Sequence, residues 1–444
     1  MLVEHDSADV SVSDSSGGDR RLDAPGSNLA AVTTQAAADR LNATFYARIQ
    51  YPPAPQAFER VTDPGFWSRM LAQDVGSWHE PVVGSGSEVW VAGCGRNQAL
   101  ITALKFPQAS VLGSDLSETS LGVCQAHALQ VGAANLQLRR ESINDVSYGE
   151  RFDYVVCTGV IHHNADPEVA LRRLARSLRP RGVLELMVYN QFHRLNSAAF
   201  QRAIRTWLGD AAAVDIDREA ALARQLLDDA GGAQRLAAIG RQFRAADFAY
   251  FADALLQPIE HSFTVASLSD MAEQCGLELL AFVVDHFSRA QSAIDWNLAF
   301  TDPALKARYE ALPDVTRWQI TNYLLMEQSP MLWFYLQRRD SPRRRRSEQA
   351  MAADFMNLRV RRNRTEREMF VQREDGSYGP PSVSAFPKMP IDPVAARVFN
   401  ACDEGLPMSE AMRSVGLDTS FRTVHRLRVR LATTAYPFLT AIQP

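Results

Sequence analysis

Short apolar runs alternate with helix-like segments through the middle of the chain and predict a parallel α/β sheet. The runs that suit strands buried on both faces are residues 88–92, 111–115, 136–139, 152–157 and 183–189. Between them, residues 118–131 and 167–178 are predicted to be helical. Ligands of such sheets bind at the carboxyl ends of the strands.

A glycine pair follows the first predicted strand. Gly93 and Gly95 remove side chains where the backbone turns sharply and a ligand can approach closely. Asp115 ends the second strand roughly 20 residues further on, where a carboxylate can accept both hydroxyls of a ribose. Because Gln98 stands where a dinucleotide-binding turn has a third small residue, the pattern favours an adenosine ligand without a pyrophosphate.

Further motifs follow in order: Phe152-Asp-Tyr-Val-Val-Cys157, Val160-Ile-His-His163 with Asp166-Pro167, and Leu178-Arg-Pro-Arg-Gly182. Together with Val91-Ala-Gly-Cys-Gly95 and Gly113-Ser-Asp-Leu-Ser117, they make residues 88–189 resemble class I S-adenosylmethionine-dependent methyltransferases. The resemblance implies a Rossmann-like seven-stranded sheet whose last strand runs antiparallel. Residues 276–284 and 330–337 suit the two remaining strands.

The resemblance also implies which residues contact S-adenosylmethionine. The glycine turn and the end of the fourth strand would face its methionine part, Asp115 its ribose, and Leu116 with the turn after the third strand its adenine. For Ile143 in that turn, the alternative is plain core packing. The expected contacts are Gly93, Cys94, Gly95, Asp115, Leu116, Ser142, Ile143, Asn144, Thr158 and Gly159.

Methyl transfer is an in-line displacement that needs alignment, desolvation and, for some nucleophiles, loss of a proton. His162 and His163 follow the fourth strand and Tyr189 ends the fifth, so these three are the candidate catalytic residues. The alternative for the histidines is a structural role, pairing with backbone groups. The candidates for reading a substrate amine or hydroxyl are Asn190, Asp253, Glu260 and His261.

The composition along the chain predicts its domains. Residues 1–32 are predicted to be a disordered tail, because they are rich in Ser, Asp and Gly. The methyltransferase domain is expected over residues 33–338, with the Ala-rich insertion 190–275 as a helical lid. A basic linker over 339–350 and a small C-terminal α+β domain over 351–444, which resembles winged-helix modules, complete the prediction.

Aromatic residues gather ahead of the first strand, and two interpretations stay open for them. They form either an apolar staple under the sheet or a flap over the cofactor. The group comprises Phe45, Tyr46, Tyr51, Phe58, Phe66 and Trp67.

Charge and cysteine content narrow the class of protein. The formal net charge is −4 and 46% of residues are hydrophobic, as in ordinary globular proteins. The 5 cysteines have no paired spacing, so we expect reduced thiols and neither a metal site nor a disulfide framework. The sequence has neither an apolar run of about 20 residues nor a secretion signal, which predicts a cytoplasmic protein without a membrane partner.

The sequence therefore predicts methyl transfer from S-adenosylmethionine to a small-molecule or peptide-like natural product in a lidded pocket. Nucleic-acid methylation is an alternative in which Arg422, Arg426, Arg428 and Arg430 would form the recognition face. Against it, the fourth strand ends without the Asp/Asn-Pro-Pro-aromatic or Pro-Cys signatures of enzymes that act on flipped bases. A non-catalytic binding protein that works through its C-terminal domain is the other alternative, and a homodimer stays open.

Overall fold

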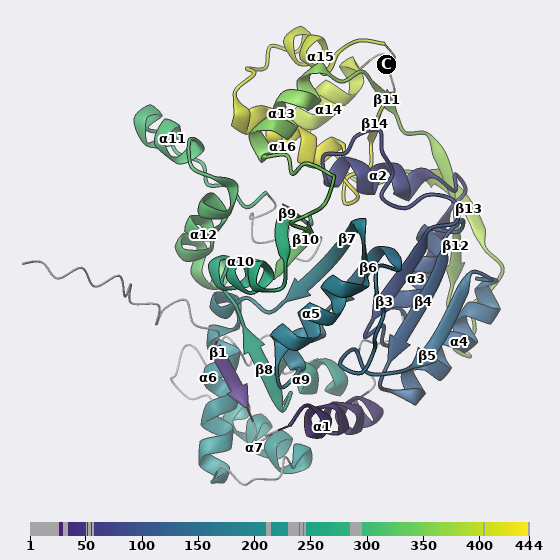
Figure 1. Cartoon of the computed structure of the whole chain (residues 1–444), viewed down its shortest axis with the longest axis vertical. Helices are drawn as coiled ribbons and strands as arrows, with labels where there is room; N and C mark the ends of the chain where they lie inside the picture. Colours follow the sequence, from purple (N-terminus) through teal and green to yellow (C-terminus); the bar gives the residue numbers. More distant parts are fainter. Residues whose placement is uncertain are drawn as a thin grey trace, which may run out of the picture.

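The computed structural model describes residues 26–29, 34–49, 51, 55, 57–209, 215–229, 239, 243, 246–284, 295–402 and 405–442, the first four in their backbone alone. At its centre lies a seven-stranded sheet with the order β5-β4-β3-β6-β7-β10-β9 (Figure 1). Its strands are β3 (Glu88–Ala92), β4 (Ser110–Asp115), β5 (Leu136–Arg140), β6 (Phe152–Thr158), β7 (Leu178–Val188), β9 (Leu277–Phe282) and β10 (Leu332–Arg338). Only β10 pairs antiparallel with its neighbours in this sheet. The predicted Rossmann-like α/β sheet with an antiparallel last strand is therefore confirmed.

Helices cover both faces of this sheet. Val89 and Val91 of β3 face one core, and Trp90 and Ala92 face the other. Because successive residues of a strand point to opposite faces, a central strand covered on both sides needs an unbroken apolar run. The first core includes α2 (Phe66–Asp74), α3 (Gln98–Lys105) and α4 (Glu118–Val131), and the second α5 (Pro167–Ser177), α10 (Val265–Gln274) and α12 (Asp314–Leu325).

The start of α5 follows the sequence prediction. The side chain of Asp166 accepts hydrogen bonds from the backbone N–H groups of Glu168 and Val169, and Pro167 occupies the first turn, where no donor is lost. This cap fixes the end of the loop that follows β6.

A separate group of helices shares a third apolar core. These helices are α1 (Gln35–Arg48), α6 (Gln191–Leu208), α7 (Ile216–Asp228) and α9 (Phe248–Leu255). They lie together in the lower part of Figure 1. Phe45 and Ile49 of α1 belong to the same core as Phe200 and Ile204 of α6, so α1 packs with the insertion 190–275. The aromatic group ahead of the sheet is thus divided, since Phe58, Phe66 and Trp67 lie in the core of α2 to α4.

The insertion is mostly helical, as predicted, but it also contains the strand β8 (Ile259–Ser262). This strand pairs antiparallel with β1 (Gly26–Leu29). Residues 26–29, which fall within the tail predicted over residues 1–32, form a strand, whereas residues 1–25 and 30–33 lie outside the described residues. Composition measures the apolar surface that a segment can bury, but main-chain hydrogen bonds to a distant strand hold β1.

The C-terminal residues are interlocked with the N-terminal part of the chain. The strand β12 (Thr365–Val371) pairs with β13 (Ser382–Phe386) and also with β2 (Ala57–Val61). The remaining elements are α13 (Glu348–Asn357), β11 (Val360–Arg362), α14 (Pro393–Ala401), α15 (Met408–Ser414), α16 (Phe421–Leu431) and β14 (Leu439–Ala441), and α11 (Pro303–Glu310) projects beside α12 (Figure 1). None of the described helices is long and apolar enough to cross a bilayer.

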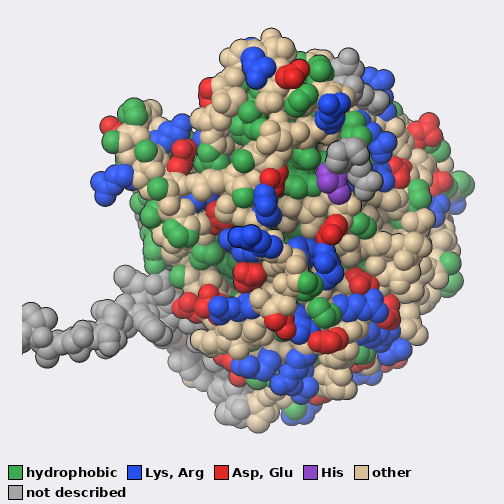
Figure 2. Space-filling view, turned by 45° about the horizontal axis from the view of Figure 1, so that its top comes forward, with side chains coloured by type: hydrophobic (Ala, Val, Ile, Leu, Met, Phe, Trp, Pro, Cys, Tyr) green, Lys and Arg blue, Asp and Glu red, His purple; other side chains and the backbone are tan. Residues whose placement is uncertain are grey.

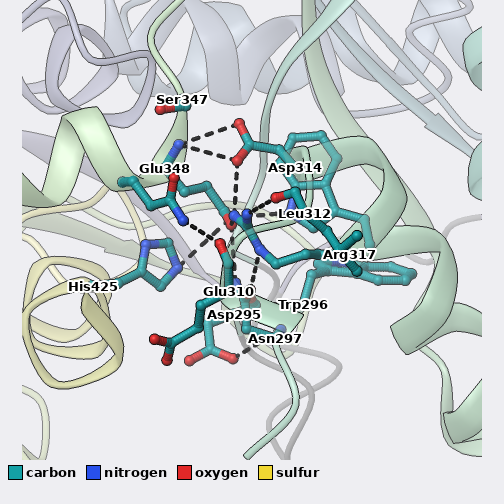
Figure 3. A network of polar contacts seen from close by, with 12 residues as sticks. Asp295, Trp296, Asn297, Glu310, Leu312, Asp314, Arg317, Ser347, Glu348 and His425 are labelled. Carbon is teal, nitrogen blue, oxygen red and sulfur yellow. Dashed lines mark hydrogen bonds and ion pairs between the residues drawn. The ribbon is translucent and has the colours of Figure 1, made fainter. Parts of the chain in front are cut away.

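A buried polar cluster joins α12 to the C-terminal region, and we call it the junction cluster (Figure 3). Arg317 donates to Glu348 at 2.6 Å and to Asp314 at 2.7 Å, and Trp318 donates to Glu348 at 3.0 Å. Arg345 donates to the other oxygen of Asp314 at 2.8 Å. Part of the predicted basic linker 339–350 is thus fixed against α12 by buried ion pairs.

Candidate active site

The glycine turn after β3 and the acid that ends β4 are held together by main-chain hydrogen bonds. Gly93 and Gly95 have φ angles of 68° and 52°, which favour glycine, and a Cβ on Gly93 would lie 2.4 Å from Val160. One carboxylate oxygen of Asp115 accepts from the N–H of Gly95 and the other from the N–H of Ser117, both at 2.8 Å. Each oxygen keeps a further lone pair, so the oriented carboxylate fits the two hydroxyls of a ribose.

Cys94 and Leu116 flank these residues. The N–H of Cys94 donates to the carbonyl of Ser114 at 2.9 Å, and burial raises the pKa of its thiol well above the usual value. Cys94 therefore shapes the turn through its backbone, and its side chain stays a neutral thiol. Leu116 is half-buried at the edge of the sheet, next to Asp115.

The turn predicted to contact adenine is covered by α1. Ser142 donates to Asp39 of α1 at 2.6 Å, and Asn144 donates to Asp39 at 3.3 Å and to Asn164 at 2.7 Å. Ile143 is 7% exposed and belongs to the core of α5 and α10, which is the alternative expected for it. The polar residues of this turn thus face α1.

Thr158 and Gly159 stand at the end of β6 and are half-buried. Gly159 has a φ of 77°, and its N–H donates to the carbonyl of Met187 at 3.1 Å. Since the following residue, Val160, contacts Gly93, this loop lies beside the glycine turn. The structure therefore brings the predicted methionine-side residues together.

His162, His163 and Tyr189 form one buried aromatic cluster. The ring centroid of His162 lies 3.9 Å from that of Tyr189 and 4.1 Å from that of His163. His162 is fully buried, and neither of its ring nitrogens has a hydrogen-bond partner among the described residues. Burial holds the pKa of His162 well below its usual value, so the ring is neutral at pH 7 and carries one acceptor nitrogen. Burial also keeps the pKa of the Tyr189 phenol well above its usual value.

His163 has structural partners. Its Nδ1 lies 2.7 Å from the carbonyl of Ile259 in β8, which can only accept, so this nitrogen carries the proton. Asn42 of α1 donates to the backbone carbonyl of His163 at 2.7 Å. Burial lowers the pKa of His163 to about 4. His163 thus pairs with a backbone group, the arrangement described by the structural alternative for these histidines.

Glu260 is paired with a cation that sequence reasoning missed. Arg194 donates to the two oxygens of Glu260 at 2.9 and 2.6 Å and to the carbonyl of Ala254 at 2.7 Å. Burial alone would raise the pKa of Glu260, but the Arg194 guanidinium holds it below its usual value. The guanidinium carbon also lies 4.4 Å from the ring centroid of Tyr189. Glu260 is therefore a neutralised carboxylate.

Among the described residues, no cation forms an ion pair with Asp253. Tyr46 of α1 donates to its Oδ1 at 3.0 Å, and Gln257 donates to the hydroxyl of Tyr46 at 2.9 Å. Burial raises the pKa of Asp253 to about 7. His261 lies nearby in β8, and its buried Nε2 has no partner among the described residues.

Asn190 occupies a different position from the other predicted substrate residues. Its two N–H groups donate to Ser329 at 2.8 Å and to the carbonyl of Pro330 at 2.6 Å, while its oxygen accepts from the N–H of Phe192 at 3.1 Å. Asn322 donates to the same oxygen at 3.1 Å. The side chain thus caps α6 and ties it to the residues before β10, with both N–H groups occupied.

Comparison with known proteins agrees with this geometry. Residues 90–184 match the methyltransferase domain family. A ubiquinone biosynthesis O-methyltransferase from Leptothrix cholodnii is 32% identical over 119 residues, which are 26% of this chain and 50% of that protein. An uncharacterized protein from Synechococcus is 28% identical over 242 residues, 52% of this chain and 57% of that one. The chain spans about half the length of the curated relatives it matches.

The fold likeness extends further along the chain. The structure of PKMT2 from Rickettsia typhi superposes on this chain with a TM-score of 0.55 and 16% identity. The superposition covers 88% of this chain and 77% of PKMT2. That protein has also been solved in complex with AdoHcy. Residues 88–189 therefore belong to a Rossmann-like methyltransferase fold, and residues 90–184 within them match the methyltransferase domain family.

The arginines of α16 do not form a common outer face of the methyltransferase. Arg422 pairs with Asp295, Arg430 pairs with Asp392, and Arg428 is 2% exposed. On the face drawn in Figure 2, basic side chains are interspersed with acidic ones. This arrangement gives no support to a nucleic-acid recognition helix.

A polar stripe on α1 is the feature of the methyltransferase site that sequence reasoning missed. Gln35, Asp39, Asn42 and Tyr46 follow one another at spacings of four, three and four residues and so share one face of the helix. Gln35 donates to Asn164 at 3.0 Å, and the other three contact the adenine-side turn, His163 and Asp253. The signal was present in the sequence as four polar positions at helical spacing.

Proposed function

We propose that this chain transfers a methyl group from S-adenosylmethionine to a small-molecule or peptide-like natural product. When bound, the cofactor supplies an electrophilic methyl group on a sulfonium. Asp115 would hold the ribose hydroxyls, the turn from Gly93 to Gly95 would adjoin the methionine part, and Ser142 and Asn144 would lie near the adenine. The observation that carries the proposal is the Asp115 carboxylate, oriented by the N–H groups of Gly95 and Ser117.

His162 is the proposed proton acceptor for the substrate nucleophile. Both of its ring nitrogens are buried without a described partner, which costs about 1–3 kcal/mol for each unsatisfied group. Such groups persist where a ligand completes them. Tyr189 would hold the ring of His162 through their contact at 3.9 Å.

The proposed lid consists of α1 together with α6, α7 and α9. These helices share one apolar core, and the polar stripe of α1 contacts the adenine-side turn, His163 and Asp253. A substrate would enter as this unit moves, and closure would exclude water from the sulfonium.

Calorimetric titration with AdoHcy tests the proposal. We expect binding to the wild type and a loss of affinity of about 30- to 100-fold in Asp115→Ala, because two hydrogen bonds to a charged group are lost. Asp270→Ala, at an exposed position on α10, is the control and should bind like the wild type. Absence of AdoHcy binding by the wild type, with the protein folded, would sink the proposal.

A further inference from the structure

The buried carboxylate of Asp253 forms no ion pair with a cation among the described residues. Glu260, the other acid, accepts hydrogen bonds at 2.9 and 2.6 Å from Arg194 and one at 3.2 Å from Gln201, and Arg194 also donates to the carbonyl of Ala254. Arg194 is therefore committed to Glu260. The charges of Arg194 and Glu260 cancel each other. When Asp253 is ionised, these three residues therefore carry a net negative charge that a cationic ligand would neutralise.

Hydrogen-bond acceptors are also in excess around Asp253. Its Oδ1 accepts from Tyr46, but its Oδ2 accepts no hydrogen bond from the described residues. Gln257 uses its amide N–H on the hydroxyl of Tyr46, which leaves its buried Oε1 without a partner among those residues. Gln257 is fully buried and Asp253 is 6% exposed, so bulk water compensates neither oxygen well.

Phenol groups interact with this acid. Tyr46 donates to it directly, and burial together with the charge of Asp253 raises the pKa of Tyr51 and of Tyr189. Carboxylates combined with aromatic faces suit cationic nitrogen, because the ring quadrupole attracts positive charge. A hydroxyl group brings one donor, whereas a protonated amine brings three.

We propose that Asp253, with Tyr46 and Gln257, binds the amine of an amine-bearing substrate, and that this amine nitrogen is the methyl acceptor. The inference rests on the proposed function and specifies its nucleophile. The ammonium first passes one proton to the Asp253 carboxylate, which frees the nitrogen lone pair. That lone pair forms the bond to the methyl carbon, the electrons of the carbon–sulfur bond return to sulfur, and His162 takes the second proton from the methylated nitrogen.

Binding of hexylamine and of hexanol to the AdoHcy-loaded protein tests the inference without catalysis. By calorimetry we expect hexylamine to bind the wild type at least about ten-fold more tightly than hexanol, because only the amine forms a charge-assisted hydrogen bond to Asp253. Asp253→Asn should reduce the affinity for hexylamine at least about ten-fold and leave that for hexanol unchanged. Asp270→Asn, at an exposed position on α10, is the matched control and should bind both probes like the wild type.

Equal affinity of the wild type for the two probes would overturn the inference, and this comparison needs no variant. Unchanged hexylamine affinity in Asp253→Asn would overturn it as well, provided that AdoHcy still binds the variant. Failure of AdoHcy to bind the wild type would instead overturn the proposed function, so the two failures are distinguishable.

Discussion

Two buried polar clusters lie in different parts of this molecule, and they differ in how completely their groups are paired. In the junction cluster, Glu348 is 1% exposed and accepts from Arg317, Trp318 and Asn297 (Figure 3). Asp314 likewise forms ion pairs with Arg317 and Arg345. Apart from His425, whose two buried ring nitrogens have no hydrogen-bond partner among the described residues and whose Nε2 lies 3.7 Å from Glu348, the groups named here have direct partners.

The second cluster lies at the carboxyl end of the sheet and includes His162, Gln257 and His261. Several of its buried polar atoms lack hydrogen-bond partners among the described residues. His162 has two unpartnered nitrogens, and Gln257 and His261 each have one unpartnered buried atom among the described residues. Desolvated groups left in this state destabilise a fold, so a protein keeps them where a ligand completes the network. The contrast suggests that the junction cluster serves architecture and the sheet-end cluster serves binding.

The largest expected effect is on the junction cluster. Glu348→Ala should lower the free energy of unfolding by about 3–5 kcal/mol, because Arg317 is left buried without its carboxylate. Urea unfolding measures this change, with Glu366→Ala at an exposed position of β12 as the control. A loss below about 1 kcal/mol would mean that the junction cluster is not structural.

An intermediate effect should separate the two neighbouring histidines. His163→Phe removes the hydrogen bond to Ile259 and should cost about 1–3 kcal/mol of unfolding free energy, because the carbonyl is left buried and unpaired. His162→Phe keeps the ring contact with Tyr189 and deletes two unpaired nitrogens, so stability should stay unchanged or rise.

The same pair of variants separates structure from chemistry. If His162 accepts the proton, methyl transfer to hexylamine should fall about 100-fold in His162→Phe although the protein is stable. A comparable loss of stability in both variants would contradict the distinction between them.

The sheet and the cofactor edge were predictable because their signals are local. A strand, a glycine turn and an acid occur within residues 88–115, and the hydrogen bond from Gly95 to Asp115 joins residues 20 apart. The cap of α5 at Asp166 is equally local. Each motif specifies its own geometry, so its order along the chain is enough to place it.

The substrate side depends on pairings between distant residues. Ser142 and Asp39 are 103 residues apart, and Tyr46 and Asp253 are 207 apart. Sequence spacing predicts that a helix has a polar face but not which carboxylate or turn that face meets. The arginines of α16 show the converse, because their spacing indicates a common face while Asp295 and Asp392 pair with them separately.

The last effect concerns the pH dependence of stability, and it compares the buried acids of the two clusters. Burial and the charge of Glu260 raise the pKa of Asp253 to about 7. The hydrogen bond from Tyr46 and the charge of Arg194 act in the opposite direction. Between about pH 4 and pH 7 the folded state therefore holds a proton that the unfolded chain has released. The stability that this proton provides is complete below the unfolded pKa and is lost as pH rises through 7.

Asp253→Asn should remove this dependence. Relative to the wild type, the variant should gain roughly 2–3 kcal/mol of unfolding free energy between pH 5 and pH 7.5, measured by urea unfolding across that range. Glu348→Gln is the matched change in the junction cluster and should destabilise, because it removes the charge that holds Arg317. Parallel pH profiles for Asp253→Asn and the wild type would show that Asp253 is ionised and paired, and the contrast between the two clusters would then fail.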